Sequence, residues 1–161
     1  MLKIYFQDIF NTTKTGDATE ESYYPDLKRL FENWGKEKRK KFYITPLPKR
    51  TEAGNPDFRI WDGKEKIVGY IEAKAPTVEN LEVIEHSEQL ERYRHTFPNL
   101  LFTNFFEFRL YRNGELIDNI SIGRPFAIYK LKMDSRRLCE IFPFCTMENR
   151  KNKCWDSWFY H

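Results

Sequence analysis

Residues 54–76, GNPDFRIWDGKEKIVGYIEAKAP, contain the clearest structural pattern of the sequence. They contain two runs rich in β-branched and aromatic residues, 58–61 and 67–75, with Asp62-Gly63-Lys64 between them. Runs of this kind between turn signals predict strands, and the Asp-Gly pair predicts a tight hairpin. The stretch is therefore expected to form two antiparallel neighbours in a sheet.

The same hairpin gathers charged residues at one end. Side chains alternate between the faces of a strand, so Glu72 and Lys74 share a face while Ile71 and Ala73 face a core. Asp57 stands directly before the first strand, and the pairing brings it near Glu72. Carboxylates are the oxygen ligands that Mg²⁺ prefers, and a lysine adds fixed positive charge beside a phosphate. The pattern predicts metal-dependent cleavage of a phosphodiester.

The remaining sequence predicts helices that flank this sheet. Residues 2–10 have the spacing of a short amphipathic helix, and Asp17 with Glu20 forms a capping-box pattern for a helix that runs to about Lys40. Further expected elements are strands at 42–44, 100–103, 106–111 and 116–122 and a helix at 81–95. The element order predicts an α/β fold with a mixed β-sheet between helices.

Composition indicates one domain of modest positive charge. The chain has 161 residues, 17% aromatic residues and a net charge of +3, so it can bury a core and is not strongly basic. Residues 36–41, Lys49-Arg50 and Arg92 with Arg94 are candidate DNA-facing clusters, and each is also readable as a solvated helix end or loop. No signal peptide or membrane segment is seen, so a cytoplasmic location without a membrane partner is expected.

The C-terminal part has a different character. Residues 1–125 are expected to form the domain, and residues 126–161 an extension packed on it, with a short helix at 135–142. Three cysteines match no zinc-site spacing and are interpreted as free thiols: Cys139, Cys145 and Cys154.

Pro56-Asp57 and Glu72-Ala73-Lys74 resemble, in order and spacing, the PD-(D/E)XK nuclease superfamily in its RecB-like and Mrr-like branch. The resemblance implies a restriction-endonuclease-like core and a Mg²⁺-dependent DNA endonuclease in which Mn²⁺ substitutes. It implies that Asp57, Glu72 and the Ala73 carbonyl hold the metal and that Lys74 positions the attacking water. The alternative is an exposed hairpin with a solvated Glu–Lys pair.

Residues 19–23, Thr-Glu-Glu-Ser-Tyr, resemble the T-E-x-S-Y stretch before the catalytic strands in restriction-modification nuclease domains. The resemblance implies Glu20 as a further metal ligand and Glu21 as a spare. The alternative is that Glu20 only caps the helix and favours its dipole.

Gln89 and Tyr93 are four residues apart and share a helix face. They resemble the Q-x-x-x-Y pattern of the RecB-like branch, which implies catalytic residues that orient the DNA backbone and the active site. Tyr93 is alternatively a core aromatic residue, and Gln89 a surface residue.

Residues 15–120 as a whole resemble the N-terminal nuclease domain of single-chain restriction-modification enzymes that also carry an N6-adenine methyltransferase. This chain has no glycine-rich cofactor loop, no Asn-Pro-Pro-Tyr-type motif and no helicase P-loop. The resemblance implies DNA as substrate and a methyltransferase or specificity subunit as a partner, and an oligomer stays open. Two other functions stay open on the same fold: a non-catalytic DNA- or protein-binding module, and a resolvase or repair nuclease.

Overall fold

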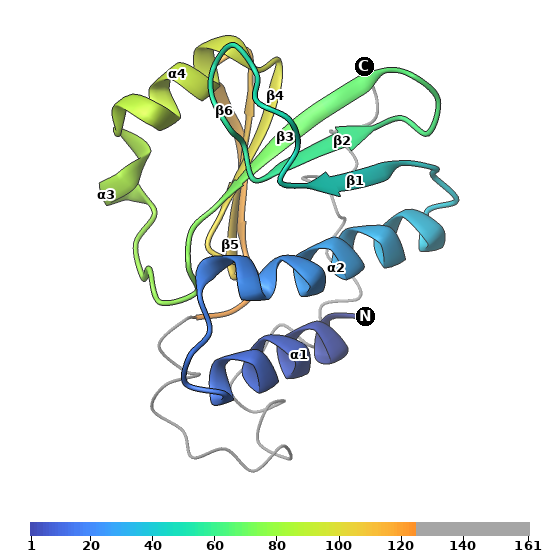
Figure 1. Cartoon of the computed structure of the whole chain (residues 1–161), viewed down its shortest axis with the longest axis vertical. Helices are drawn as coiled ribbons and strands as arrows, with labels where there is room; N and C mark the ends of the chain where they lie inside the picture. The colour runs from blue at the N-terminus through green and yellow to red at the C-terminus, as the bar shows by residue number, and fades with distance from the viewer. Residues whose placement is uncertain (125–161) are drawn as a thin grey trace.

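A computed structural model describes residues 1–124. Six strands form one sheet in the order β1-β2-β3-β4-β5-β6, with helices on both faces (Figure 1). β3 and β4 pair in parallel, whereas the other neighbours are antiparallel. The predicted α/β class, a mixed sheet flanked by helices, is confirmed. The predicted extension with its helix and free thiols lies outside the described residues.

The strands lie close to their predicted positions: Tyr43–Pro46 (β1), Phe58–Trp61 (β2), Ile67–Ala73 (β3), Asn99–Thr103 (β4), Glu107–Arg112 (β5) and Glu115–Ser121 (β6). The β2–β3 turn forms as the Asp-Gly pair predicts. The Asp62 carboxylate accepts hydrogen bonds from the N–H groups of Lys64 and Lys66 at 2.8 and 3.1 Å. Gly63 takes a φ of +83°, which suits glycine.

The helices are Leu2–Lys14 (α1), the 3₁₀ helix Glu20–Tyr23 (η1), Tyr24–Glu37 (α2), Glu82–Glu85 (α3) and Glu88–Thr96 (α4). The predicted capping box of Asp17 and Glu20 is wrong. Thr19 precedes η1 instead, and its N–H donates to the Ser22 hydroxyl at 3.1 Å. α2 follows at once, with Pro25 in its first turn, where no N–H partner is needed. No helix within residues 1–124 has the length and apolarity to cross a membrane.

α2 ends before Lys40, which is earlier than predicted. The N–H of Lys40 donates to the Gly35 carbonyl at 2.8 Å, and the N–H of Arg39 donates to the Lys36 carbonyl at 3.1 Å. This Schellman arrangement closes the helix, with Arg39 at a φ of +55°. Gly35 lies in the last turn because a Cβ there would stand 2.5 Å from the Phe42 ring.

The single helix predicted at 81–95 is divided into α3 and α4. The Asn80 side chain accepts a hydrogen bond from the Glu82 N–H at 2.8 Å at the start of α3. Ser87 has an extended backbone and accepts from the Leu90 N–H at 3.4 Å as the N-cap of α4. One continuous helix cannot pass through a residue in this conformation.

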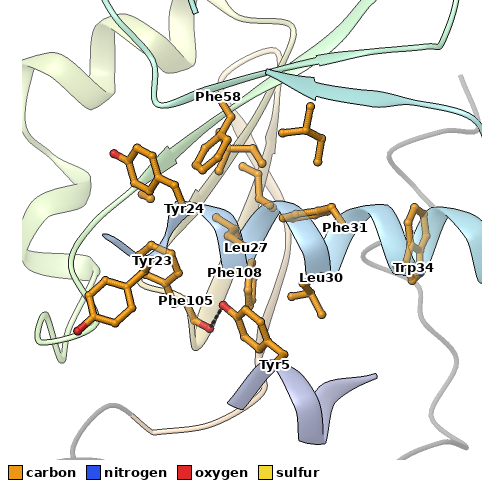
Figure 2. Close-up of a cluster of buried hydrophobic side chains, with 14 of the residues drawn as sticks. Tyr5, Tyr23, Tyr24, Leu27, Leu30, Phe31, Trp34, Phe58, Phe105 and Phe108 are labelled. Carbon is orange, nitrogen blue, oxygen red and sulfur yellow. Dashed lines mark hydrogen bonds between the residues drawn. The ribbon is translucent and has the colours of Figure 1, made fainter. Parts of the chain in front are cut away.

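Two apolar clusters lie on opposite faces of the sheet. α1, η1 and α2 cover one face, where side chains such as Phe31 and Phe58 are buried (Figure 2). α3 and α4 cover the other face, where Leu90 is buried. The alternation along β3 places Ile71 in the first cluster, as predicted, and turns Glu72 to the opposite face, where it contacts Gln89 of α4.

Candidate active site

Asp57 lies directly before β2, where two neighbours hold its carboxylate. The Tyr24 hydroxyl donates to Oδ1 at 2.6 Å, and the Ala73 N–H donates to Oδ2 at 2.7 Å. Tyr24 begins α2 and Ala73 ends β3, so this carboxylate joins the helical layer to the sheet. Hydrogen bonds to a charged acceptor are stronger than neutral ones, so the Asp57 side chain is held in one position.

Glu72 is buried, with 2% of its surface exposed. Its Oε1 accepts hydrogen bonds from Lys74 Nζ at 2.7 Å and from Gln89 Nε2 at 3.2 Å. Its Oε2 is also buried, and no donor within residues 1–124 reaches it. Such an atom carries the full desolvation penalty of a charged oxygen unless a ligand or ion satisfies it. Glu72 is thus the polar group of the site that most needs a bound ligand or ion.

Gln89 and Tyr93 extend the site along α4. Gln89 Nε2 lies 3.2 Å from the Tyr93 hydroxyl as well as from Glu72. The Tyr93 ring is buried in the core cluster, while its hydroxyl faces Gln89. The core position expected as the alternative for Tyr93 is therefore compatible with a position at the site. Gly54, with a φ of +133°, packs against this ring, since a Cβ there would lie 3.1 Å from the hydroxyl.

Glu20 reaches the same group of charges from the start of η1. Its pKa responds to the charges of Lys74 and Asp57 and to the neighbouring Tyr24 hydroxyl. Glu21, the next residue, is exposed. Glu20 thus lies near these charges and Glu21 is exposed, and the role of Glu20 as a metal ligand stays a prediction.

The acids of the site outnumber its positive charge. Burial and the charge of Asp57 together raise the pKa of Glu72 to about 7, against the lowering effect of Lys74. Burial also raises the pKa of Asp57 and of Glu20. Burial lowers the pKa of Lys74, but the surrounding carboxylates outweigh it and raise this pKa overall. One lysine does not balance three carboxylates, so the site favours a further cation.

The donor set fits a hard divalent cation. Within residues 1–124, no three His, Cys, Asp or Glu side chains form a ready ligand cluster. Mg²⁺ does not need one, because it binds through one or two carboxylates and keeps several waters. The unsatisfied Glu72 oxygen and the adjacent Asp57 carboxylate supply that number. Glu20 and the Ala73 carbonyl stand beside them, and the role of each as a ligand stays a prediction.

The raised pKa values predict how the metal-free protein responds to pH. A carboxyl whose pKa is raised by folding binds more protons in the folded state than in the unfolded state. Its contribution to the free energy of unfolding therefore falls as pH rises. For Glu72 this window runs from the ordinary value of 4.5 to about 7. Asp57 and Glu20 act in the same direction, whereas Lys74 stays charged throughout. The free energy of unfolding in EDTA, measured with urea, is expected to fall across this window.

Mg²⁺ is the control for that titration. A cation that binds only the folded protein stabilises it by mass action, so added Mg²⁺ should reverse the loss at pH 8. The Glu72→Gln variant removes the carboxyl with the largest shift and should flatten the pH dependence. A metal-free stability that rises between pH 5 and 7 would contradict the electrostatic description of the site.

Tyr24 belongs to the site and was not predicted from the sequence. Burial raises its pKa, and its hydrogen bond to Asp57 raises it further, so the hydroxyl stays a donor. The nearest signal in the sequence is one residue away. Tyr24 follows the stretch 19–23, in which Tyr23 matches the tyrosine of the resembled T-E-x-S-Y pattern. In the structure the Tyr23 hydroxyl contacts Thr13 at 3.1 Å, away from the acids.

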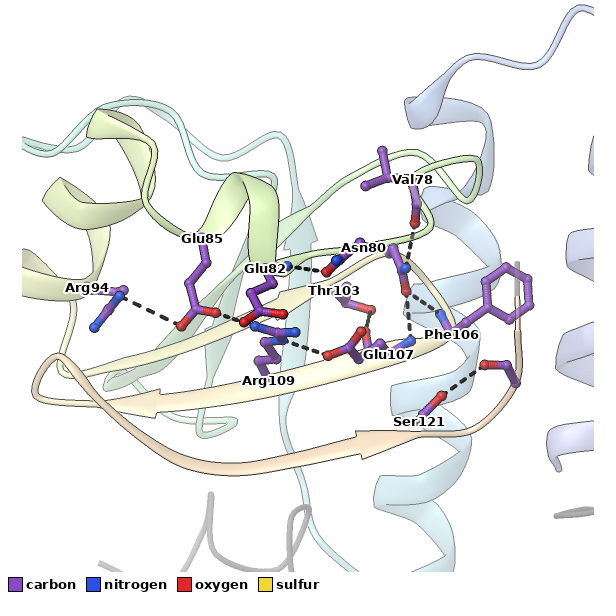
Figure 3. Close-up of polar contacts among 12 residues, drawn as sticks. Val78, Asn80, Glu82, Glu85, Arg94, Thr103, Phe106, Glu107, Arg109 and Ser121 are labelled. Carbon is purple, nitrogen blue, oxygen red and sulfur yellow. Dashed lines mark hydrogen bonds and ion pairs between the residues drawn. The ribbon is translucent and has the colours of Figure 1, made fainter. Parts of the chain in front are cut away.

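A charged network holds α3 and α4 against the sheet (Figure 3). Arg109 on β5 contacts Glu85 at the end of α3 and Glu107 at 2.6 Å on its own strand. Glu85 also lies 3.9 Å from Arg94 on α4. Because α4 carries Gln89, this network fixes the helix that supports one side of the site.

The two helix arginines predicted to face DNA make contacts within the protein. Arg92 donates to the Ala53 carbonyl at 2.7 Å and so ties α4 to the loop that leads to Asp57. Arg94 donates to the Gly114 carbonyl at 3.0 Å in the β5–β6 turn. These contacts give both arginines a structural role, and contact with DNA stays a prediction.

Comparisons with known proteins support the fold. No family model matches the chain, and no curated protein matches it. Among solved structures, a chain of the cryoEM structure of the DrdV–DNA complex is similar, with a TM-score of 0.57 and 18% sequence identity. The match covers 87% of this chain and 13% of that chain, so this protein spans a small part of the length of the protein it matches. At this identity, the likeness shows a shared fold.

Proposed function

We propose that this protein is a Mg²⁺-dependent DNA endonuclease of the PD-(D/E)XK type, the nuclease part of a restriction-modification system. The observation that carries the proposal is the buried Glu72 carboxylate, which has one oxygen on Lys74 and one oxygen without a donor. Asp57 and Glu20 add negative charge beside it. Carboxylates and one lysine at the end of a hairpin supply the oxygen ligands and the positive charge that phosphodiester hydrolysis requires.

Each residue has a defined task in this proposal. Lys74 positions the attacking water and stabilises the negative charge that develops on the phosphate. Gln89 donates to Glu72 and orients its carboxylate, and with Tyr93 it lines the path of the DNA strand. Asp57, held by Tyr24, presents the second carboxylate. When bound, Mg²⁺ supplies a water of lowered pKa and neutralises phosphate charge, and Mn²⁺ is expected to substitute.

DNA is the proposed partner. The DrdV structure with a similar fold is a DNA complex, which supports DNA as the ligand of this fold. The modest net charge of +3 fits a nuclease whose acidic site is offset by basic residues elsewhere. A methyltransferase or specificity subunit as a further partner stays a prediction from the sequence resemblance.

Glu20 and Glu21 offer a matched pair of substitutions. Glu20→Gln removes a carboxylate from the site, so we expect weaker Mg²⁺ binding by calorimetry and cleavage that is roughly 10-fold to 100-fold slower. Glu21→Gln changes the same chemistry one residue away, on an exposed side chain, and should match the wild type. Equal loss in both variants would show that Glu20 acts only through the helix terminus.

Tyr24 and Tyr23 form a second matched pair. Tyr24→Phe removes the hydroxyl that donates to Asp57 and keeps the ring that packs against Phe58 at 4.7 Å between centroids. Residues that orient a metal-binding carboxylate typically contribute 10-fold to 100-fold to activity, so a loss of about that size in kcat is expected. Tyr23→Phe should leave kcat unchanged. If both variants cleave at the wild-type rate, Tyr24 does not position Asp57.

The proposed function is tested by incubating the full chain with supercoiled plasmid in Mg²⁺, Mn²⁺ or EDTA. Nicked or linear plasmid with either metal, and intact plasmid with EDTA, is the expected result. A four-way junction tested beside the plasmid separates a resolvase, which would prefer the branched substrate. Plasmid that stays intact with both metals, at protein in excess over DNA, would contradict the proposal.

A further inference from the structure

Exposed basic residues gather at the end of the sheet remote from the acids. Lys36, Arg39 and Lys41 come from the end of α2 and the connection to β1, and Lys64 and Lys66 from the β2–β3 turn. We call these five residues the basic end. The two segments touch, since a Cβ on Gly63 would lie 3.2 Å from the Lys41 Cβ. Figure 1 shows the end of α2, the start of β1 and this turn together at the right of the view.

Within residues 1–124, which carry no net charge, the positive charge is concentrated there. Residues 36–41 and 62–66 contain seven Lys or Arg against three Asp or Glu, a local excess of +4, whereas the whole chain carries +3. The other residues between 1 and 124 contain 13 Lys or Arg against 17 Asp or Glu and are therefore acidic. One of the three local acids, Asp62, turns its carboxylate to the backbone of its own turn. A segregated charge of this kind attracts a polyanion.

The backbone conformation of Arg39 is an independent indication that the basic end has a function. It has a φ of +55° at the position after α2 where helices usually place glycine. Any side chain with a Cβ is unfavourable in this left-handed conformation, and such strain concentrates at functional positions. The Arg39 side chain is exposed, so no burial offsets the strain. An open pocket at this end is lined by Lys36, Lys41 and the exposed Tyr43, together with one acid, Glu32.

The distance between the basic end and the acidic site limits which ligand can contact both. β3 connects the β2–β3 turn to the Glu72–Lys74 end and spans seven residues. At about 3.3 Å per residue, its length is roughly 20 Å. This equals about six base pairs of duplex at 3.4 Å each. A single nucleotide or a small anion cannot bridge that distance, but a DNA duplex can.

We propose that the basic end binds the phosphate backbone of duplex DNA about six base pairs from the bond held at the acidic site. The inference rests on the proposed function and extends it: the substrate is a duplex that continues along the β2–β3 hairpin, and the protein holds it at two separated points. Contacts to phosphate fix the position of the duplex without reading its sequence. The basic end therefore contributes to affinity and leaves the chemical step to the acidic site.

Binding of a labelled duplex of about 20 base pairs, followed by fluorescence anisotropy in Ca²⁺ over a range of salt, tests the proposal. The variants are Arg39→Gly and the double variant Lys64→Gln/Lys66→Gln. Each lost phosphate contact reduces the slope of log K against log salt by about 0.9, so reductions of about 0.9 and 1.8 are expected. The charge control is Lys3→Gln/Lys14→Gln on α1, which should keep the wild-type slope.

Two further readouts separate a binding role from a structural one. Arg39→Gly relieves a left-handed conformation and should not lower the Tm, as Asn113→Gly, at a φ of +49° in the β5–β6 turn, should not. In plasmid cleavage the basic-end variants should raise KM and keep kcat, unlike variants of the acidic site. Slopes and KM equal to the wild type would overturn the inference, even where the wild type cleaves DNA, and would favour an acidic protein partner.

Discussion

Glu72→Gln is expected to reduce plasmid cleavage at least ~10²-fold, the loss seen when one group that stabilises a developing charge is removed. Glutamine preserves the size of the side chain and removes the charge on which Lys74 and Gln89 converge. It also removes the oxygen that no donor within residues 1–124 satisfies. Calorimetric titration with Mn²⁺ should show a matching loss of metal binding, because the two effects have one origin.

Glu79→Gln is the control for this result. Glu79 is exposed and lies a short distance along the chain from Glu72, so its loss should change neither cleavage nor metal binding. Circular dichroism of both variants establishes that the fold is intact. A Glu72→Gln protein that cleaves at the wild-type rate would remove Glu72 from the site.

Arg109→Met is expected to lower the free energy of unfolding by about 3 kcal/mol, the size typical for breaking a buried ion pair from one side. Arg109 is 11% exposed, and its partners Glu85 and Glu107 are 13% and 22% exposed. Methionine fills similar space but leaves Glu107 without its cation and Glu85 with only the more distant Arg94, at 3.9 Å. Urea unfolding measures the loss, and Tm should fall by roughly 6–12 °C.

Two controls test the physical reason for this loss. Lys28→Met removes an exposed pair with Glu32, whose atoms lie 3.8 Å apart, and should cost less than about 1 kcal/mol. Glu85→Gln added to Arg109→Met removes one of the stranded charges and should recover part of the stability. If the losses in free energy of unfolding simply add in the double variant, unpaired charge is not the cause of the Arg109→Met loss.

The residues of the hairpin could be placed from the sequence because their geometry is local. Asp57 directly precedes β2, and Glu72 and Lys74 lie at the end of β3, so strand alternation and antiparallel pairing set their relative positions. Gln89 follows from helical spacing within α4, which survives the break at Ser87 because both Gln89 and Tyr93 lie after it.

The remaining features depend on contacts between distant segments. Tyr24 reaches Asp57 only because α2 packs on the sheet, across 33 residues of sequence. The parallel pairing of β3 with β4 sets the Glu72 end of β3 beside Phe102 and Thr103, which no local pattern specifies. The early end of α2 depends on the Phe42 ring, which packs against Gly35. The contact between Arg109 and Glu85 joins β5 to α3. Tertiary packing decides each of these.

The role of the acids and Lys74 in metal-dependent cleavage is tested by plasmid cleavage with the wild type and with Lys74→Ala in Mn²⁺, with EDTA as the blank. Lys14→Ala, on an exposed lysine of α1, is the matched control. Metal-dependent nicking or linearisation is expected for the wild type and for Lys14→Ala, with a loss of ~10²-fold or more in Lys74→Ala. Cleavage that is equal in all three proteins, or that persists in EDTA, would contradict this role.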